Sequence, residues 1–289
     1  MPSPTPPPVT HYENFPVASL LCPKQLRPAV AAIYHFARTT DDLADEGELV
    51  AGARLLALHR YRRALELATA PAPYPTDGDW PDVMPPLQHA VRQHDLPAAL
   101  LHDLLTAFER DILHSEAVAV YPRHDDLIDY ARYSANPVGR LMLHLYGVRS
   151  EPALRQSDAI CTALQLFNFW QDISVDVSRG RYYLPQDLAD RHGVDCRDPM
   201  HAPAAQRAAL LQELLERARG LMSQGAALPE AVAGIAGRKA AWELRLVMQG
   251  GLRIGEKTAK LGAEAFSKRP RIGAMDGLLM PARSLQPLR

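Results

Sequence analysis

The chain carries the stretch Tyr34-His35-Phe36-Ala37-Arg38-Thr39-Thr40-Asp41-Asp42-Leu43-Ala44-Asp45, in which an apolar run leads into three carboxylates. At 3.6 residues per turn, Asp41 and Asp45 fall on one face of a helix, with Arg38 and Tyr34 on the same stripe one and two turns earlier. Carboxylates one turn apart repel each other unless a cation or solvent relieves them. The stretch therefore predicts a helix whose acidic end faces a cation or solvent.

A second acidic stretch, Gln165-Leu166-Phe167-Asn168-Phe169-Trp170-Gln171-Asp172-Ile173-Ser174-Val175-Asp176, mirrors the first. Asp172 and Asp176 repeat the one-turn spacing, and Asn168 and Gln165 continue their stripe upstream. The apolar surroundings predict burial, and buried carboxylates need a partner or a metal. Two such stripes facing each other would form a cage of oxygen ligands, which suits Mg²⁺ better than zinc.

These two acidic motifs, in this order and followed by Gly180-Arg181-Tyr182-Tyr183-Leu184-Pro185, resemble the motifs of the squalene/phytoene synthases. The resemblance runs from about residue 11 to about residue 269. It implies an all-α fold, namely a single-domain helical bundle of the isoprenoid synthase type with a central cavity. It also implies head-to-head chemistry on prenyl diphosphates.

The resemblance also implies roles for individual residues. The metal ligands would bind Mg²⁺, with Mn²⁺ as a second candidate, and are Asp41, Asp42, Asp45, Asn168, Asp172 and Asp176. The residues that contact the substrate or its diphosphate would be Arg38, Tyr34, Asn14, Gln165, Asn168, Arg181 and Tyr183. The catalytic residues would be Asp41, Asp45, Asp172, Asp176 and Tyr130.

Ordinary structural roles compete with several of these assignments. Asp42 lies about 100° off the stripe of Asp41 and Asp45, which places it one step from the metal or in solvent. Arg38 either pairs with Asp41 or Asp42 within its helix or clamps diphosphate oxygens. Gln165 and Asn168 either cap a buried polar network or touch ligand and metal.

Aromatic and acidic side chains elsewhere have the same two interpretations. Tyr34, Tyr130 and Trp242 either pack in the core or line the path of a carbocation. Asp111, near the end of a predicted helix, is expected to be a solvated charge rather than a group that faces the cavity.

Two positions depart from the family pattern. Asn136-Pro137 replaces the glycine that follows Tyr130-x-x-Tyr133-x-Ala135 in relatives, and a proline there kinks the helix and leaves room for a ligand. Gln171 stands where many relatives carry a basic residue, which removes a positive charge from the predicted diphosphate pocket.

The runs Asn14-Phe15-Pro16-Val17-Ala18-Ser19 and Asn168-Phe169-Trp170-Gln171-Asp172 look most like the hydroxysqualene-forming branch of the family in bacterial hopanoid synthesis. This resemblance implies Mg²⁺-dependent ionisation of presqualene diphosphate, rearrangement, and capture of the cation by water, without NADPH. Alternatives are a presqualene diphosphate, squalene or phytoene synthase. A non-catalytic assembly factor is a further alternative, but such relatives tend to lose the acidic pairs that this chain retains.

Composition narrows the class of protein. The 289 residues are 47% hydrophobic with a net charge of −1, so no overall field recruits nucleic acid. The cysteines Cys22, Cys161 and Cys196 suggest neither a disulfide framework nor a zinc site, which fits a cytoplasmic protein. No uncharged apolar run is long enough to cross a bilayer.

The resemblance also implies a location and partners. The hydrocarbon substrate implies peripheral contact with the inner membrane, and the pathway implies presqualene diphosphate synthase and hydroxysqualene dehydroxylase as partners.

The predicted organisation is a disordered proline-rich tail (1–10), one helical domain (11–267), and a basic, proline-containing C-terminal tail (268–289). Lys268, Arg269 and Arg271 of that tail either form a membrane-facing patch or, as we expect, stay solvated. The predicted helices are 27–45, 51–70, 84–94, 97–114, 125–146, 151–176, 204–224, 228–239 and 240–260, the last two with the option of being continuous.

Overall fold

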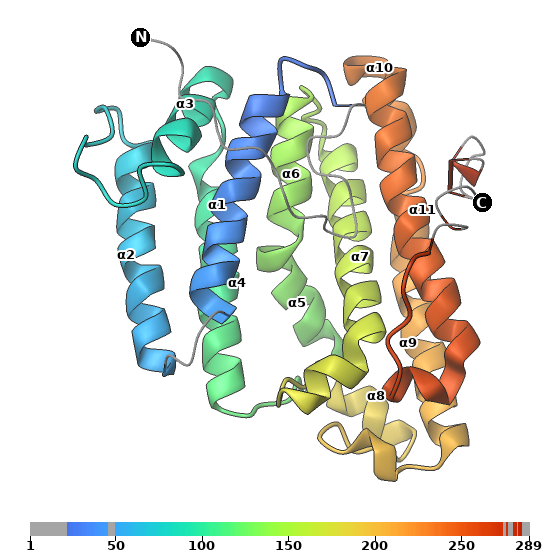
Figure 1. Ribbon diagram of the computed structural model, residues 1–289. Coiled ribbons are helices and arrows are strands. Elements are labelled where there is room, and N and C mark those ends of the chain that lie inside the picture. The colour runs from blue at the N-terminus through green and yellow to red at the C-terminus, as the bar shows by residue number, and fades with distance from the viewer. Residues whose placement is uncertain (1–21, 46–49, 274–275, 277–279, 282, 285–289) are drawn as a thin grey trace.

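The computed structural model describes residues 22–45, 50–273, 276, 280–281 and 283–284. Within this part the chain is built from helices, and its β-structure is limited to a single bridge between Val120 and Tyr182. The predicted all-α fold is confirmed. In chain order the helices of Figure 1 are α1 (Arg27–Asp45), α2 (Ala51–Thr69), α3 (Met84–His94), α4 (Ala98–Glu116), α5 (His124–Ser134), α6 (Asn136–Leu145), α7 (Glu151–Ser178), α8 (Gln186–Arg191), α9 (Ala204–Gln224), α10 (Leu228–Ala236) and α11 (Arg238–Leu261), with short 3₁₀ turns at Pro199–His201 and Gly262–Phe266.

The helix predicted over 125–146 is broken, as the proline at its centre indicates. α5 ends at Ser134, and α6 begins at Asn136 with Pro137 in its first turn. Proline is favoured there because its missing N–H would have no partner in a first turn anyway. The break changes the direction of the chain beside α7, the longest helix.

The boundary predicted between residues 239 and 240 is wrong by a few residues. α10 ends at Ala236, and α11 starts at Arg238 after Gly237, whose φ is +90°. This backbone conformation is open to glycine and strained for other residues, so Gly237 separates the two helices. The segment is therefore not one continuous helix.

α7 is the helix around which the second half of the chain packs. It contacts α6, α9 and α11, and its buried face contributes Phe167 and Trp170 to the larger hydrophobic cluster. Glycines let α11 approach closely: a Cβ at Gly251 would lie 2.4 Å from Leu164 Cδ2, and one at Gly255 would lie 2.6 Å from Phe167 Cε1. The position of α7 is thus fixed by tight packing on the face that contacts α11.

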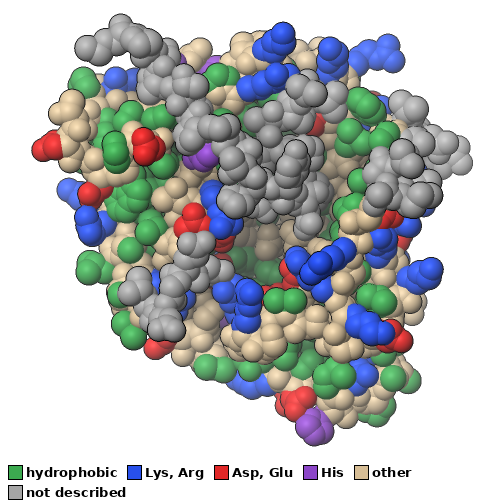
Figure 2. Space-filling model, viewed as in Figure 1, with side chains coloured by type: hydrophobic (Ala, Val, Ile, Leu, Met, Phe, Trp, Pro, Cys, Tyr) green, Lys and Arg blue, Asp and Glu red, His purple; other side chains and the backbone are tan. Residues whose placement is uncertain are grey.

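A second hydrophobic cluster joins α1, α2, α3 and α4, with Phe36 and Tyr61 fully buried in it. The face of the molecule seen in Figure 2 is hollowed near its centre, with hydrophobic side chains in the hollow and acidic and basic side chains at its rim. In the same view, α1 belongs to one half of the fold and α7 to the other (Figure 1). The two acidic motifs therefore lie on helices of different halves of the fold.

A helix must be both long and apolar to span a membrane. None of the helices in the described part combines the length and the apolar character that crossing a bilayer requires.

Candidate active site

The first acidic motif occupies the last two turns of α1. Arg38 Nη1 lies 3.0 Å from Asp41 Oδ2, and Arg38 Nη2 lies 2.6 Å from Asp42 Oδ1. All of these side chains are about a third exposed, at 32%, 40% and 38%. The ion pairs predicted for Arg38 are therefore both formed. Asp42 shares the Arg38 guanidinium with Asp41 despite its angular offset.

The other predicted residues of this half are only partly described. Tyr34 is half-buried one turn before Arg38. Asp45 is the last residue of α1, and its side chain lies outside the described part, as does the whole of Asn14. Arg54 of α2 donates to the carbonyl of Ala44 at 2.9 Å, which places a cation at the negative end of the α1 dipole.

The second motif lies on a half-buried stripe of α7. Gln165, Asn168, Asp172 and Asp176 are all half-buried, whereas the residues between them are mostly core. Helical spacing thus brings these four predicted residues onto one face, as expected. Asp172 is held by Arg269, whose Nη2 lies 3.0 Å from Asp172 Oδ2 and whose Nε contacts Oδ1.

Asp176 is a strongly perturbed carboxyl of the site. Burial raises its pKa to about 6, and the neighbouring charge of Asp172 acts in the same direction. Arg181, Arg179 and Arg269 oppose the shift without cancelling it. The second motif therefore places two carboxylates close together in a partly desolvated position, where a further cation would be stabilising.

This shift predicts a pH-dependent cost in the metal-free protein. Because the folded-state pKa of Asp176 lies above its model value of 3.8, the folded state loses stability as the pH rises from about 4 to about 6. Asp176→Asn mimics the protonated carboxyl and should stabilise the protein by about 1–2 kcal/mol at about pH 7.5, after allowance for solvent screening. Urea unfolding in EDTA at about pH 4 and pH 7.5 measures this, and an equal gain at both pH values would contradict it.

The turn after α7 brings Arg181 and Tyr183 to a polar cavity. Gly180, with φ +72°, reverses the chain, and the Arg181 N–H donates to the Asp176 carbonyl at 2.9 Å. The cavity has a volume of about 250 Å³. It is lined by Ala44, Arg54, Asp111, Ile112, Ser115, Glu116, Arg179, Arg181 and Tyr183.

Asp111 faces this cavity, so the expectation of a solvated charge is wrong. Tyr130 donates its hydroxyl hydrogen to Asp111 Oδ2 at 2.6 Å. This contact joins α4 to α5, and no local pattern in either helix encodes it. Asp111 is consequently a site residue, and the cavity-facing alternative to a solvated charge is the correct one.

Aromatic rings pack together next to the Tyr130–Asp111 hydrogen bond. Tyr183 stacks on Phe169 with ring centroids 4.0 Å apart, and Tyr130 lies 5.9 Å from Phe169. Burial and the charge of Asp111 raise the pKa of both tyrosines well above the usual range, so both hydroxyls stay protonated. The core-packing interpretation of Tyr130 is correct for its ring, while its hydroxyl reaches the polar cavity residue Asp111.

The two positions that depart from the family pattern support neighbouring elements. Asn136 is buried and accepts a hydrogen bond from the Thr162 hydroxyl at 3.0 Å, which ties α6 to α7. Gln171 is 2% exposed and donates to the Pro270 carbonyl at 2.8 Å. Gln171 therefore binds the segment that follows α11 and does not stand in for a cation in the cavity.

The described part of the C-terminal segment is attached to the helices. Lys268 pairs with Glu264 at 2.8 Å, and Trp242 donates to the Ser284 hydroxyl at 2.6 Å. Arg269 is exposed, as expected of a solvated residue, but it is not part of an unattached tail, since it pairs with Asp172. Arg269 thus supplies positive charge at the second motif from a position that is 97 residues away in the chain.

The donor atoms fit a hard cation such as Mg²⁺. Among the described residues no three acidic, histidine or cysteine side chains lie close enough to hold one ion together. Mg²⁺, however, is commonly bound by one or two carboxylates together with substrate phosphates and water. The first motif offers one such carboxylate, Asp41 on α1, and the second offers two, Asp172 and Asp176 on α7.

Comparison with known proteins places the chain. The family model for squalene/phytoene synthase matches residues 9–276. The chain is similar to hydroxysqualene synthase of Zymomonas mobilis, with 35% identity over 219 residues that cover 72% of this chain and 69% of that protein. It is also 35% identical to hydroxysqualene synthase of Rhodopseudomonas palustris over 217 residues, covering 74% and 69%.

A solved structure agrees with these relatives. The crystal structure of squalene synthase HpnC from Alicyclobacillus acidocaldarius superposes with a TM-score of 0.76 at 34% identity and covers 88% of this chain and 90% of that one. The fold is therefore that of the isoprenoid synthases, as the two acidic motifs implied. The chain belongs to the squalene/phytoene synthase family.

Proposed function

We propose that this protein ionises presqualene diphosphate and that water captures the rearranged cation, giving hydroxysqualene and diphosphate. The overall reaction balances as presqualene diphosphate plus water yielding hydroxysqualene plus diphosphate, so no hydride donor is needed. The proposal of this particular substrate rests on the similarity to two proteins named hydroxysqualene synthase.

The observation that carries the proposal is the arrangement around Asp176. A carboxylate pair on α7 lies next to arginines of the following turn, as the electrostatic effect of Arg179 and Arg181 on Asp176 indicates. Stacked rings of Phe169 and Tyr183 lie on the apolar side. A diphosphate and its metal need the charged environment of carboxylates and arginines, and a hydrocarbon cation needs the aromatic one.

Named residues have distinct roles in this scheme. Asp41, Asp172 and Asp176 would hold Mg²⁺, which supplies charge neutralisation for the leaving diphosphate. Arg181 from the turn after α7 would bind diphosphate oxygens. Phe169, Tyr130 and Tyr183 exclude bulk water from the cation and stabilise it through their ring faces.

The Tyr130–Asp111 pair suits the last step. A water that attacks the cation must lose a proton, and a carboxylate reached through a tyrosine hydroxyl is an acceptor within a hydrogen-bonded chain. The Tyr130 hydroxyl oxygen would therefore take the proton from water as its own proton passes to Asp111. The distance of 2.6 Å between Tyr130 Oη and Asp111 Oδ2 supports this relay.

A second candidate is squalene synthesis, which the similarity to squalene synthase HpnC favours. It would require a hydride donor in place of water. The product therefore separates the two candidates.

Purified protein incubated with presqualene diphosphate and Mg²⁺, without NADPH, is expected to release diphosphate and form hydroxysqualene. Gas chromatography with mass spectrometry identifies the product, and oxygen-18 water should place its label in the new hydroxyl group. Formation of squalene only when NADPH is added would support the second candidate. If a parallel incubation consumes farnesyl diphosphate while presqualene diphosphate is left unchanged, both candidates are contradicted, because the protein would then catalyse an earlier condensation.

A further inference from the structure

The segment after the last 3₁₀ turn crosses from α11 to the second acidic motif. We define residues 268–273 and 276 as the C-terminal strap. At its start, Arg269 grips both oxygens of Asp172, and the next residue, Pro270, accepts a hydrogen bond from Gln171 at 2.8 Å. Two adjacent residues of the strap thus bind two adjacent residues of α7.

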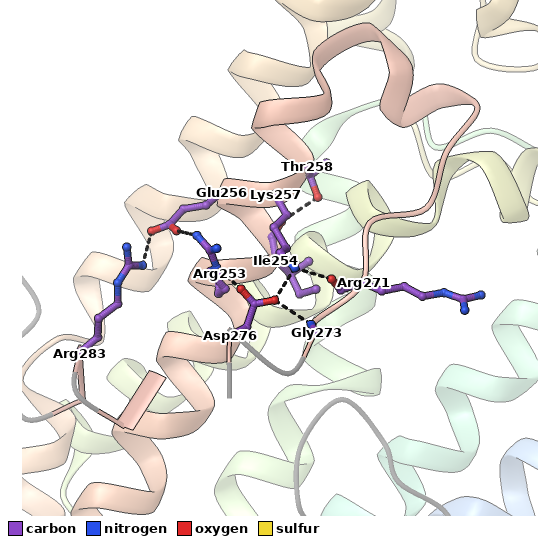
Figure 3. Close-up of polar contacts among 9 residues, drawn as sticks. All are labelled: Arg253, Ile254, Glu256, Lys257, Thr258, Arg271, Gly273, Asp276 and Arg283. Carbon is purple, nitrogen blue, oxygen red and sulfur yellow. Dashed lines mark hydrogen bonds and ion pairs between the residues drawn. The ribbon is translucent and has the colours of Figure 1, made fainter. Parts of the chain in front are cut away.

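The far end of the strap is anchored by a buried carboxylate. Asp276 is 3% exposed and accepts from Arg253 Nε at 2.7 Å and from the Gly273 N–H at 2.7 Å, and it also contacts Lys257. Lys257 in turn donates to the Arg271 carbonyl at 2.6 Å. Figure 3 shows Asp276 at the centre of this network, where it links Arg253 and Lys257 of α11 to Gly273 of the strap.

The anchor holds the strap in a defined place. The hydrogen bond from Gly273, followed by Lys257 and Arg253, lowers the pKa of Asp276 far below its usual value, so the carboxylate stays ionised and its pairs stay formed. Glu256 extends the network by pairing with Arg253 at 2.7 Å and Arg283 at 2.7 Å. The position of Arg269 over α7 is therefore set by α11 rather than by chance contact.

We propose that Arg269 is a positioning residue, which the anchored strap delivers to Asp172 so that its guanidinium holds this carboxylate in the metal-free protein and competes with the metal for it. This inference rests on the proposed function, because it takes Asp172 as a metal-binding residue. It goes beyond that function by assigning a role to residues outside both acidic motifs.

The competition follows from the contact itself. A guanidinium that binds both carboxylate oxygens occupies the positions that a cation would use. The pair is partly exposed, 38% for Arg269 and 26% for Asp172, so it is weak enough to be displaced. In the absence of metal the same contact relieves the repulsion between Asp172 and Asp176.

Binding of Mn²⁺ alone, followed by electron paramagnetic resonance without any substrate, tests this role. Arg269→Gln should bind Mn²⁺ about two- to fivefold more tightly than the wild-type protein, which is the factor expected for a displaced ion pair of this exposure. Unchanged or weaker binding in Arg269→Gln would overturn the inference.

Two further variants separate competition for Asp172 from a general charge effect. Arg269→Lys keeps the charge but loses the two-point contact, so it should also bind Mn²⁺ more tightly, whereas a charge effect alone predicts wild-type affinity. Asp276→Asn removes a negative charge, which by itself would weaken binding of a cation. Release of the strap predicts the opposite sign, namely tighter binding.

The matched control is Lys268→Gln, which removes a neighbouring positive charge whose partner is Glu264. It should leave Mn²⁺ affinity unchanged, and tightening equal to that of Arg269→Gln would overturn the inference. Thermal melting checks that Asp276→Asn is folded, and Arg269→Lys decides the matter if it is not.

Failure of this inference is distinguishable from failure of the proposed function. If Asp172→Asn weakens Mn²⁺ binding but Arg269→Gln and Arg269→Lys match the wild type, only the role of Arg269 is overturned. If Asp172→Asn leaves Mn²⁺ binding unchanged, the metal-binding role of Asp172 fails as well, and the inference fails with it.

Discussion

Replacing Asp172 with asparagine is expected to lower the rate of Mg²⁺-dependent diphosphate release about a thousandfold. Asp172 lies beside Asp176 on the half-buried stripe of α7, and its charge contributes to the raised pKa of Asp176. Asparagine keeps the shape of the side chain but removes the negative charge that a cation needs. The loss should therefore appear in the chemical step and in metal affinity rather than in folding.

Asp158→Asn is the matched control for this variant. Asp158 is on the same helix and is also gripped by an arginine, with Arg140 Nη2 2.6 Å and Arg140 Nε 2.9 Å away. That pair joins α6 to α7 and belongs to neither acidic motif. Single-turnover release of diphosphate should be nearly unchanged in Asp158→Asn, and equal losses in both variants would show that Asp172 acts only through the stability of α7.

Local sequence patterns predicted much of the fold. The bounds of α1, α3 and α9 match the predicted ranges 27–45, 84–94 and 204–224, because the apolar period and the flanking breakers are local properties. The covalent geometry of proline predicted a kink at Pro137, and the structure has a full break between α5 and α6 there. The stripe from Gln165 to Asp176 on α7 followed from helical spacing alone.

Contacts between distant segments were beyond the reach of such patterns. Asp111 has the sequence context of a surface charge, and only the packing of α4 against α5 brings Tyr130 to it. Arg269 lies in a segment whose composition resembles a solvated tail, yet Asp172 is its partner. Asp111 and Arg269 thus bring charge to the site from segments that lie outside the helical stripes of the two acidic motifs.

Gln171 illustrates the same limit in another way. The family pattern predicts a missing charge in the diphosphate pocket here, since a basic residue occupies this position in many relatives. Its 2% exposure and its bond to Pro270 show that it faces the strap. A helix position adjacent to a ligand stripe lies about 100° away from it, so proximity in sequence does not give proximity to the ligand.

Arg38→Gln is expected to lower kcat/KM for the prenyl diphosphate about a hundredfold. Arg38 bridges Asp41 and Asp42 on α1, just as Arg269 grips Asp172 on α7. When a cation takes the carboxylates, the guanidinium of Arg38 becomes available to diphosphate oxygens without leaving its helix. Steady-state kinetics at saturating Mg²⁺ measure the loss, which should fall on both KM and kcat because the contact strengthens as charge develops on the leaving group.

Arg38→Lys and Arg140→Gln make this expectation specific. Lysine keeps the charge but cannot bind two oxygens in one plane, so Arg38→Lys should recover only part of the lost kcat/KM. Arg140→Gln removes an equivalent arginine–aspartate pair outside the site and should leave kcat/KM within about twofold of the wild type, since surface pairs contribute little. Full recovery by lysine would mean that Arg38 acts only as a point charge, and wild-type kinetics in Arg38→Gln would return Arg38 to the role of an intrahelical ion pair.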